Sequence, residues 1–106
     1  RFDQPGECLF GAFRNGQLIA IGGLSYDPHA GSDIGRLRRV YVARASRGQN
    51  VGKALVQQLL EYAAQRFLVV RLSTDTPEGA AFYVRCGFLQ IQDEFATHVK
   101  SLGDAT

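Results

Sequence analysis

Residues 34–73 of the chain are IGRLRRVYVARASRGQNVGKALVQQLLEYAAQRFLVVRLS. The stretch opens with a strand-like segment, residues 34–43, and closes with an almost continuous apolar segment, residues 67–73. Between them, apolar side chains recur every three or four positions from Val51 to about Gln65, which is the spacing of an amphipathic helix. A strand, a helix and a second strand in this order predict a β-α-β crossover joining two parallel strands. The final apolar run predicts a strand that is buried on both faces.

A β-hairpin is predicted before this crossover. Residues 7–14 and 17–26 are largely apolar, and Asn15 and Gly16 lie between them. Asn-Gly is the dipeptide that best tolerates the positive φ angles of a type I′ turn. Residues 27–33 are mostly turn-forming and predict a loop that leads into the crossover.

A second helix and a closing strand pair are predicted after the crossover. Thr76 and Pro77 are a suitable N-cap and first helical residue. Gly87 is a suitable left-handed residue after the last turn. Residues 88–92 and 95–100 predict the final two strands.

The order of these elements predicts the fold class. Antiparallel strands at the front and a parallel crossover in the middle give a mixed sheet in an α/β or α+β domain. Within residues 34–43 the apolar alternation breaks at Arg38 and Arg39, which predicts a β-bulge. At 106 residues the chain has the size of a single domain.

Composition excludes several classes of protein. The hydrophobic fraction of 45% and charged fraction of 21% are those of a globular domain and exclude a disordered chain. No apolar run approaches the ~20 residues of a transmembrane helix, so no membrane association is predicted. Two cysteines, Cys8 and Cys86, are too few for a disulfide scaffold and predict core or boundary positions in a reducing compartment, the cytoplasm. Because the chain has no methionine and begins with Arg1, we expect a trimmed N-terminus or a domain cut from a longer protein.

Positive charge is concentrated in one part of the chain. Residues 34–60 contain no acidic residue, although the net charge of the whole chain is only +2. The cations of this window are Arg36, Arg38, Arg39, Arg44, Arg47 and Lys53. The cluster creates a positive field that favours a phosphorylated partner. Nucleic acid is the weaker interpretation, because only one aromatic residue, Tyr41, lies among these cations and the chain is not strongly basic.

The loop that precedes the long helix predicts a binding site for a phosphate group. Its residues are Arg47, Gly48, Gln49, Asn50, Val51, Gly52 and Lys53. The first turn of a helix leaves about four backbone N–H groups without internal partners, and the helix dipole adds positive potential there. Small residues let a phosphate approach those groups, while Arg47 and Lys53 add full charges.

Two familiar nucleotide-binding loops do not fit this stretch. A P-loop has four residues between its first Gly and its Gly-Lys pair, followed by Ser or Thr. Here Gly48 and Gly52 are separated by three residues, and Ala54 follows Lys53. The two glycines also cannot supply the G-x-G-x-x-G fingerprint of dinucleotide-binding domains.

The loop resembles the [Q/R]-x-x-G-x-[G/A] signature of the GNAT superfamily of acetyltransferases. Arg47 and Gly52 match it, and Asn50 replaces the middle glycine. Asn is the non-glycine residue that best tolerates left-handed backbone, so the departure is mild. Residues 80–88, AAFYVRCGF, look like the family's second signature, which ends in [FL]-Y-x-x-x-G-F. With the element order, the resemblance covers nearly the whole chain.

The resemblance implies a GNAT-like mixed, mostly antiparallel sheet with a cleft between two splayed parallel strands, residues 37–43 and 67–73. Acetyl-CoA would lie in this cleft as the co-substrate, and an acceptor amine would attack its thioester directly. Tyr83 matches the family's general acid, which protonates the leaving thiolate. No metal is implied. The residues implied in cofactor binding are Val40, Tyr41 and Val42 through backbone groups, together with Arg47, Gly48, Gln49, Asn50, Val51, Gly52 and Lys53.

The general base and the acceptor stay open. An amine like that of lysine has a pKa near ~10.4 and must lose a proton before it attacks. Many family members carry a Glu about where this chain has Arg36, so His29, Asp27 and Asp33 in the preceding loop are the alternatives.

We expect residues 1–106 to form one acetyltransferase domain without the N-terminal elements that usually shape the acceptor pocket. The pocket is then shortened, supplied by missing residues, or completed by a second subunit in a homodimer. The alternative function is a non-catalytic acyl-CoA-binding module, a sensor or structural domain.

Overall fold

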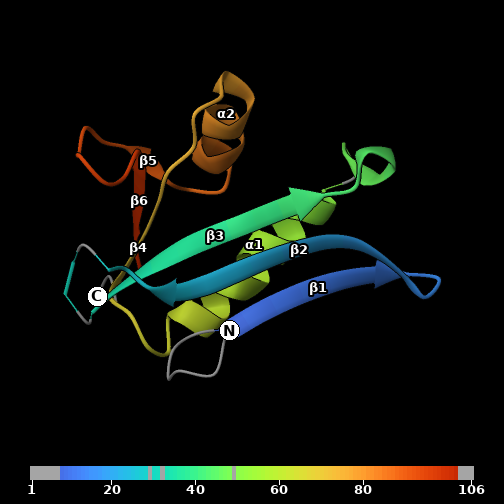
Figure 1. Ribbon diagram of the computed structural model, residues 1–106, viewed down its shortest axis with the longest axis horizontal. Coiled ribbons are helices and arrows are strands. Elements are labelled where there is room, and N and C mark those ends of the chain that lie inside the picture. Colours follow the sequence, from blue (N-terminus) through green and yellow to red (C-terminus); the bar gives the residue numbers. More distant parts are fainter. Residues whose placement is uncertain (1–7, 29, 32, 49, 103–106) are drawn as a thin grey trace.

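A six-stranded sheet forms the frame of the computed structural model, which describes residues 8–28, 30–31, 33–48 and 50–102 (Figure 1). The strands are β1 (Cys8–Arg14), β2 (Gln17–Tyr26), β3 (Ile34–Val42), β4 (Val69–Leu72), β5 (Leu89–Gln90) and β6 (His98–Ser101). They lie in the order β1-β2-β3-β4-β6-β5. Among the strand pairs of the described residues, only β3–β4 is parallel. The predicted mixed, mostly antiparallel sheet is therefore confirmed.

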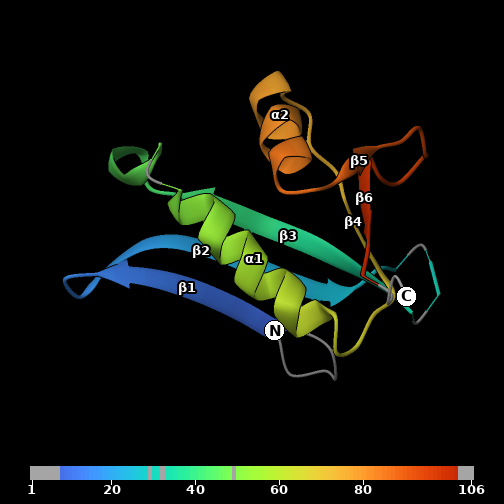
Figure 2. The same cartoon turned by 180° about the vertical axis from the view of Figure 1, so that it is seen from behind.

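The long helix lies across one face of the sheet. Helix α1 (Val51–Ala63) joins β3 to β4 and packs on β1, β2 and β3, as Figures 1 and 2 show from opposite sides. This confirms the predicted β-α-β crossover. The helix ends at Ala63 rather than near Gln65, because the N–H groups of Gln65 and Arg66 bond three residues back, to Tyr62 and Ala63. Neither helix among the described residues has the length and apolar character that crossing a membrane requires.

The predicted hairpin and bulge are both present. Asn15 and Gly16 have φ angles of 53° and 80°, as a type I′ turn demands. Residue 7 of the predicted first strand lies outside the described residues. In β3 the pairing with β2 shifts register near Arg39, whose φ is 55°.

The bulge decides which side chains of β3 face the helix. Before it, Leu37 is buried in the core. After it the alternation is shifted by one residue, so that Val40 and Val42 pack on the core and Tyr41 is 64% exposed. The second half of β3 therefore presents two valines to α1 instead of an arginine and a tyrosine.

The core lies between the sheet and α1. Its buried residues are Ala20, Leu24, Leu37, Leu55, Val56, Leu59, Leu60, Ala63, Phe67, Val70, Leu72 and Phe88. The prediction that residues 67–73 are buried on both faces holds for one face of β4 only, because Val69 and Arg71 on the other face are partly exposed. Val70 and Leu72 point into the core, but Arg71 lies on the opposite face, where it pairs with the buried carboxylate of Asp27.

The C-terminal part begins with a well-capped helix, α2 (Pro77–Arg85). The Thr76 hydroxyl accepts a bond from the Gly79 N–H at 3.0 Å, and Gly87 has a φ of 98°, both as predicted. The closing strands are shorter than predicted, because residues 91–97 form a turn. In that turn the Phe95 N–H donates to the Asp93 carboxylate at 2.9 Å.

Candidate functional site

The two parallel strands part and leave a cleft. Their register runs from Ile34 opposite Val69 to Arg36 opposite Arg71 and stops there, although β3 continues to Val42. The predicted splay is thus present, and in Figure 1 β4 and α2 lead away from the C-terminal half of β3. The cleft has a volume of about 610 Å³. It is lined by Val40, Tyr41, Val42, Ser46, Arg47, Gly48, Asn50, Val51, Gly52, Lys53, Thr74, Thr76, Glu78, Gly79, Phe82, Tyr83, Arg85 and Cys86.

One wall of the cleft is the free edge of β3. The Ala43 N–H donates to the Ile19 carbonyl of β2 at 2.7 Å. Because a trans peptide directs its N–H and C=O to opposite sides, the Val42 carbonyl of the same peptide points away from β2, toward the cleft. There it accepts a bond from Arg47 Nε at 3.2 Å. The edge therefore offers backbone groups that an extended ligand could pair with, as a further strand would.

The end of the cleft is the N-terminus of α1. Asn50 is the N-cap residue, with φ 61° and ψ 15°, and its side chain makes no capping bond. Gly48 is also left-handed, with a φ of 83°. The turn thus leaves the start of the helix without a side-chain cap, facing the cleft. Of the predicted loop residues, Gln49 lies outside the described residues, and the others line the cleft.

Gly52 lets this helix start lie close to the sheet and to α2. A Cβ atom at Gly52 would lie 3.0 Å from a Val42 methyl group and 3.3 Å from the Phe82 ring. The glycine is buried, and both neighbours pack against the core, so there is little room for a side chain here.

We expect Gly52→Leu to destabilise the protein by about 1–3 kcal/mol, because the added atoms overpack this contact. Equilibrium unfolding in urea measures the change. Ala54→Leu is the matched control, since Ala54 is exposed on the same helix, and it should change stability by no more than about 0.5 kcal/mol. Equal stability of the two variants would contradict the close contact.

Tyr83 lies on the wall opposite the β3 edge. Its ring is half-buried and packs edge-on against Phe82 and Phe88, at centroid distances of 4.9 Å and 5.7 Å. Burial raises the pKa of Tyr83 to about 12, and Cys86 adds to the increase. The phenol therefore keeps its proton over the neutral range. It lines the same cleft as Val40, Tyr41 and Val42.

The two cysteines are half-buried and free, as predicted. Burial raises the pKa of the Cys86 thiol, although Lys53, Arg85 and Lys100 partly offset the increase. Burial likewise raises the pKa of Cys8, against a smaller opposing effect of Arg66.

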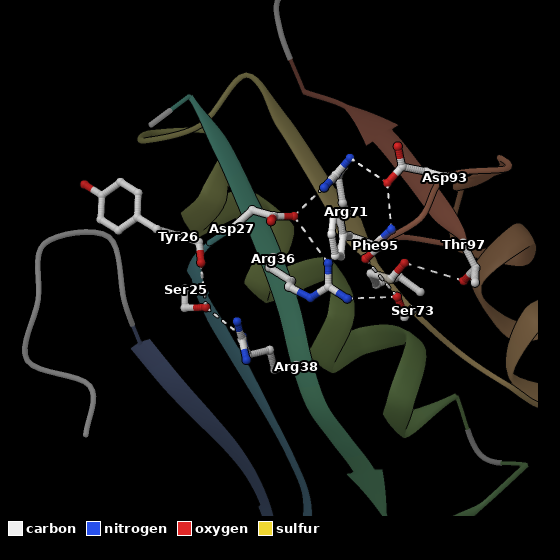
Figure 3. A network of polar contacts seen from close by, with 11 residues as sticks. Ser25, Tyr26, Asp27, Arg36, Arg38, Arg71, Ser73, Asp93, Phe95 and Thr97 are labelled. Atoms are coloured by element: carbon white, nitrogen blue, oxygen red, sulfur yellow. Dashed lines mark hydrogen bonds and ion pairs between the residues drawn. The ribbon is translucent and has the colours of Figure 1, made fainter. Parts of the chain in front are cut away.

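The two candidate bases that the structure describes, Asp27 and Asp33, do not lie at the cleft. The Asp27 side chain has no exposed surface and pairs with Arg36 at 3.3 Å and Arg71 at 3.0 Å (Figure 3). Asp27 is thus held by two guanidinium groups and is not among the residues that line the cleft, so this alternative from the sequence fails on geometry. Asp33 is exposed at the start of β3, away from the cleft lining, and His29 lies outside the described residues.

Sequence reasoning missed most of the wall that β4 and α2 supply. Thr74, Thr76, Glu78 and Arg85 line the cleft, and Glu78 is the one carboxylate among the described lining residues. The available signal was topological. A helix that follows the splayed strand must begin beside the cleft, so its first-turn residues were candidates.

Comparisons with known proteins agree with this geometry. The family model described as "Acetyltransferase (GNAT) family" matches residues 1–88. A protein of Exiguobacterium sp. 255-15, to which acetyltransferase activity is ascribed, is 28% identical and superposes with a TM-score of 0.86, over 94% of this chain and 66% of its own. Rv2747 of Mycobacterium tuberculosis, solved in complex with CoA, is 30% identical with a TM-score of 0.67, over 79% of this chain and 49% of its own.

A curated relative extends the comparison. Glucosamine 6-phosphate N-acetyltransferase 1 of Oryza sativa subsp. japonica is 35% identical over 57 residues, which are 54% of this chain and 34% of that protein. The chain thus spans about a third of that relative's length. Since the family model covers most of the chain and the fold agrees, the chain belongs to the GNAT family of acetyltransferases.

Proposed function

We propose that the chain carries the acetyl-CoA site of an N-acetyltransferase, which moves the acetyl group to a primary amine of a small molecule or peptide. One observation carries the proposal: the uncapped start of α1, the free edge of β3 and the Tyr83 phenol line a single cleft. The first suits a diphosphate, the second an extended amide-containing arm, and the third a leaving thiolate.

The residues along the cleft have different roles in this proposal. Backbone N–H groups from Gly48 to Lys53 bind the diphosphate, with Lys53 and Arg47 adding charge. For this the Arg47 side chain gives up its bond to the Val42 carbonyl, which frees the β3 edge. A backbone N–H on that edge polarises the acetyl carbonyl while the amine attacks. Tyr83 then gives its proton to the CoA thiolate, and CoA leaves as the thiol. The acetylated nitrogen loses its extra proton to solvent, and solvent returns a proton to the Tyr83 oxygen.

A non-catalytic acyl-CoA-binding module is the second candidate. Arg36 stands where the resemblance to the family leads us to expect a carboxylate, and it is bonded to Asp27 and to the Ser73 hydroxyl at 2.8 Å. β3 therefore supplies no base at this point. A sensor would bind acetyl-CoA equally well and release no CoA with any amine.

Calorimetric titration with acetyl-CoA tests the proposal, followed by assays of CoA release with a panel of amines. Glucosamine 6-phosphate belongs in the panel because a relative bears its name. We expect saturable 1:1 binding and CoA release with at least one amine. Binding without release across the panel would favour the sensor, and absence of binding would refute both candidates.

Lys53→Glu should weaken acetyl-CoA binding about tenfold or more, since it reverses a charge at the diphosphate. Arg66→Glu makes the same charge change at the other end of the crossover helix, where Arg66 lies over the Tyr62 ring. Arg66→Glu should change the dissociation constant of acetyl-CoA by less than about twofold if only charge near the diphosphate affects binding. Equal weakening in both variants would indicate a general charge effect and no site at the helix start.

A further inference from the structure

Tyr83 packs against a buried histidine that the mechanism above does not use. His98 of β6 is 1% exposed, and its ring centroid lies 6.4 Å from that of Tyr83, with the planes tilted by 48°. In the sheet His98 lies between Leu72 of β4 and Gln90 of β5. A polar ring in this position needs partners for its nitrogens.

One nitrogen of His98 has a partner whose hydrogen-bond pattern sets the tautomer. Thr97 Oγ1 lies 2.8 Å from His98 Nδ1 and accepts a bond from the Thr74 N–H at 3.0 Å. Among the described residues its other acceptor within reach is the Leu72 carbonyl, at 3.5 Å, which is longer than ordinary hydroxyl bonds. We therefore assign the single hydroxyl proton to the bond with Nδ1. In a neutral imidazole the ring proton is then on Nε2.

The other nitrogen has no partner. His98 Nε2 is buried and makes no hydrogen bond to any described residue. Buried donors without an acceptor are rare in folded proteins, and each asks for an explanation. The neighbouring ring, Tyr83, carries an oxygen that becomes negatively charged when the phenol gives up its proton. Burial opposes that charge, as the raised pKa of Tyr83 indicates.

We propose that His98 is a positioning residue for Tyr83, whose oxygen accepts a bond from His98 Nε2–H as its proton passes to the CoA thiolate. His98 keeps its own proton throughout, so the Tyr83 O–H bond breaks as the CoA S–H bond forms. The Tyr83 oxygen then regains a proton from solvent, which takes up the proton that the acetylated nitrogen loses. The proposal rests on the proposed function. Cys86, on the same helix, is the other titratable group acting on Tyr83, and Lys53, Arg85 and Lys100 surround that thiol.

Three substitutions of His98 distinguish the effect of the proposed hydrogen bond from the effect of ring packing. His98→Phe keeps a ring without a donor, and it should lower kcat about tenfold with KM for acetyl-CoA unchanged. His98→Gln places an amide N–H near the position of Nε2 and should restore kcat to within about threefold of the natural protein. His98→Asn places its amide nearer Nδ1 and should behave like His98→Phe. If His98→Phe does not fold, the Gln and Asn pair makes the same comparison.

A double-mutant cycle distinguishes support of Tyr83 from a general structural role. In a Tyr83→Phe background, His98→Phe should have no further effect on kcat, because the oxygen it serves is gone. An equal loss of kcat in both backgrounds, or equal kcat of the Gln and Asn variants, would overturn the proposal.

Nitrogen-15 NMR of the imidazole tests the pair without any turnover. The imidazole proton should be on Nε2. The Nε2 resonance should shift in Tyr83→Phe and should not shift in Cys86→Ser. A proton on Nδ1, or no response to Tyr83→Phe, would overturn the pairing. If the NMR result is as expected but no amine is acetylated, the proposed function fails and the pairing of the two rings stands.

Discussion

Tyr83→Phe is expected to lower kcat about a hundredfold or more, which is the usual contribution of a positioned general acid. The phenyl ring still packs on Phe82 and Phe88, so the walls of the cleft stay in place. KM for acetyl-CoA should therefore change little, since the loss falls on a step that follows binding. Steady-state kinetics with the best amine of the panel measures both constants.

The same substitution has a predicted effect on stability at high pH. The pKa of Tyr83 is raised from about 10 in an unfolded chain to about 12 in the folded protein. Since the folded-state value is the higher one, the phenol's contribution to stability is complete below pH 10 and is lost as pH rises toward 12. Tyr83→Phe should lack this loss. If Tyr83→Phe leaves kcat unchanged but alters the pH dependence of stability, Tyr83 is a buried packing residue and not the general acid.

The sequence predicted the fold well where patterns are local. The turn at Asn15 and Gly16 and the cap at Thr76 depend on one or two residues with strong conformational preferences. The bulge near Arg39 also follows from a break in alternation within a single strand. These preferences act before any tertiary contact forms, so they are visible in the chain alone.

The environment of β4 could not be predicted in the same way. An apolar run with one arginine is typical of a strand buried on both faces. Arg71 departs from that pattern because Asp27, far away in the sequence, supplies a buried counter-charge on the other face of the sheet. Only the folded arrangement of β2, β3 and β4 brings these charges together.

The candidate site also contains both residues that local sequence signals predict and residues that only the fold brings together. The loop before α1 was predictable because helix ends and left-handed residues have sequence signals. Thr74 and Glu78 belong to the cleft only through the splay of β3 and β4, and His98 meets Tyr83 only across β6 and α2. Such contacts depend on strand order, for which the residues themselves carry no local signal.

Asp27→Asn should destabilise the protein by about 3–5 kcal/mol, the usual result of removing one partner from a buried ion pair. Its carboxylate oxygen holds Arg36 of β3 and Arg71 of β4 at the point where their pairing stops. Arg71 also reaches Asp93 at 3.4 Å, which ties the β5–β6 turn to the sheet (Figure 3). An uncharged amide leaves two largely buried guanidinium groups without their shared carboxylate, and only the partly exposed Asp93 then faces Arg71 among the described ion pairs. Urea unfolding at neutral pH measures the change.

The matched control is Asp33→Asn, an exposed carboxylate just before β3, which should change stability by no more than about 0.5 kcal/mol. A second variant distinguishes the loss of charge compensation from a change in side-chain shape at Asp27. Arg71→Met removes the guanidinium that would be stranded, so the double variant with Asp27→Asn should lose less stability than the two single losses added together. Arg71 Nη2 is already buried without a hydrogen bond among the described residues. The Asp27 carboxylate therefore provides much of the compensation for burying the Arg71 charge. Strict additivity of the two losses would mean that Asp27 stabilises the fold by another route than this pair.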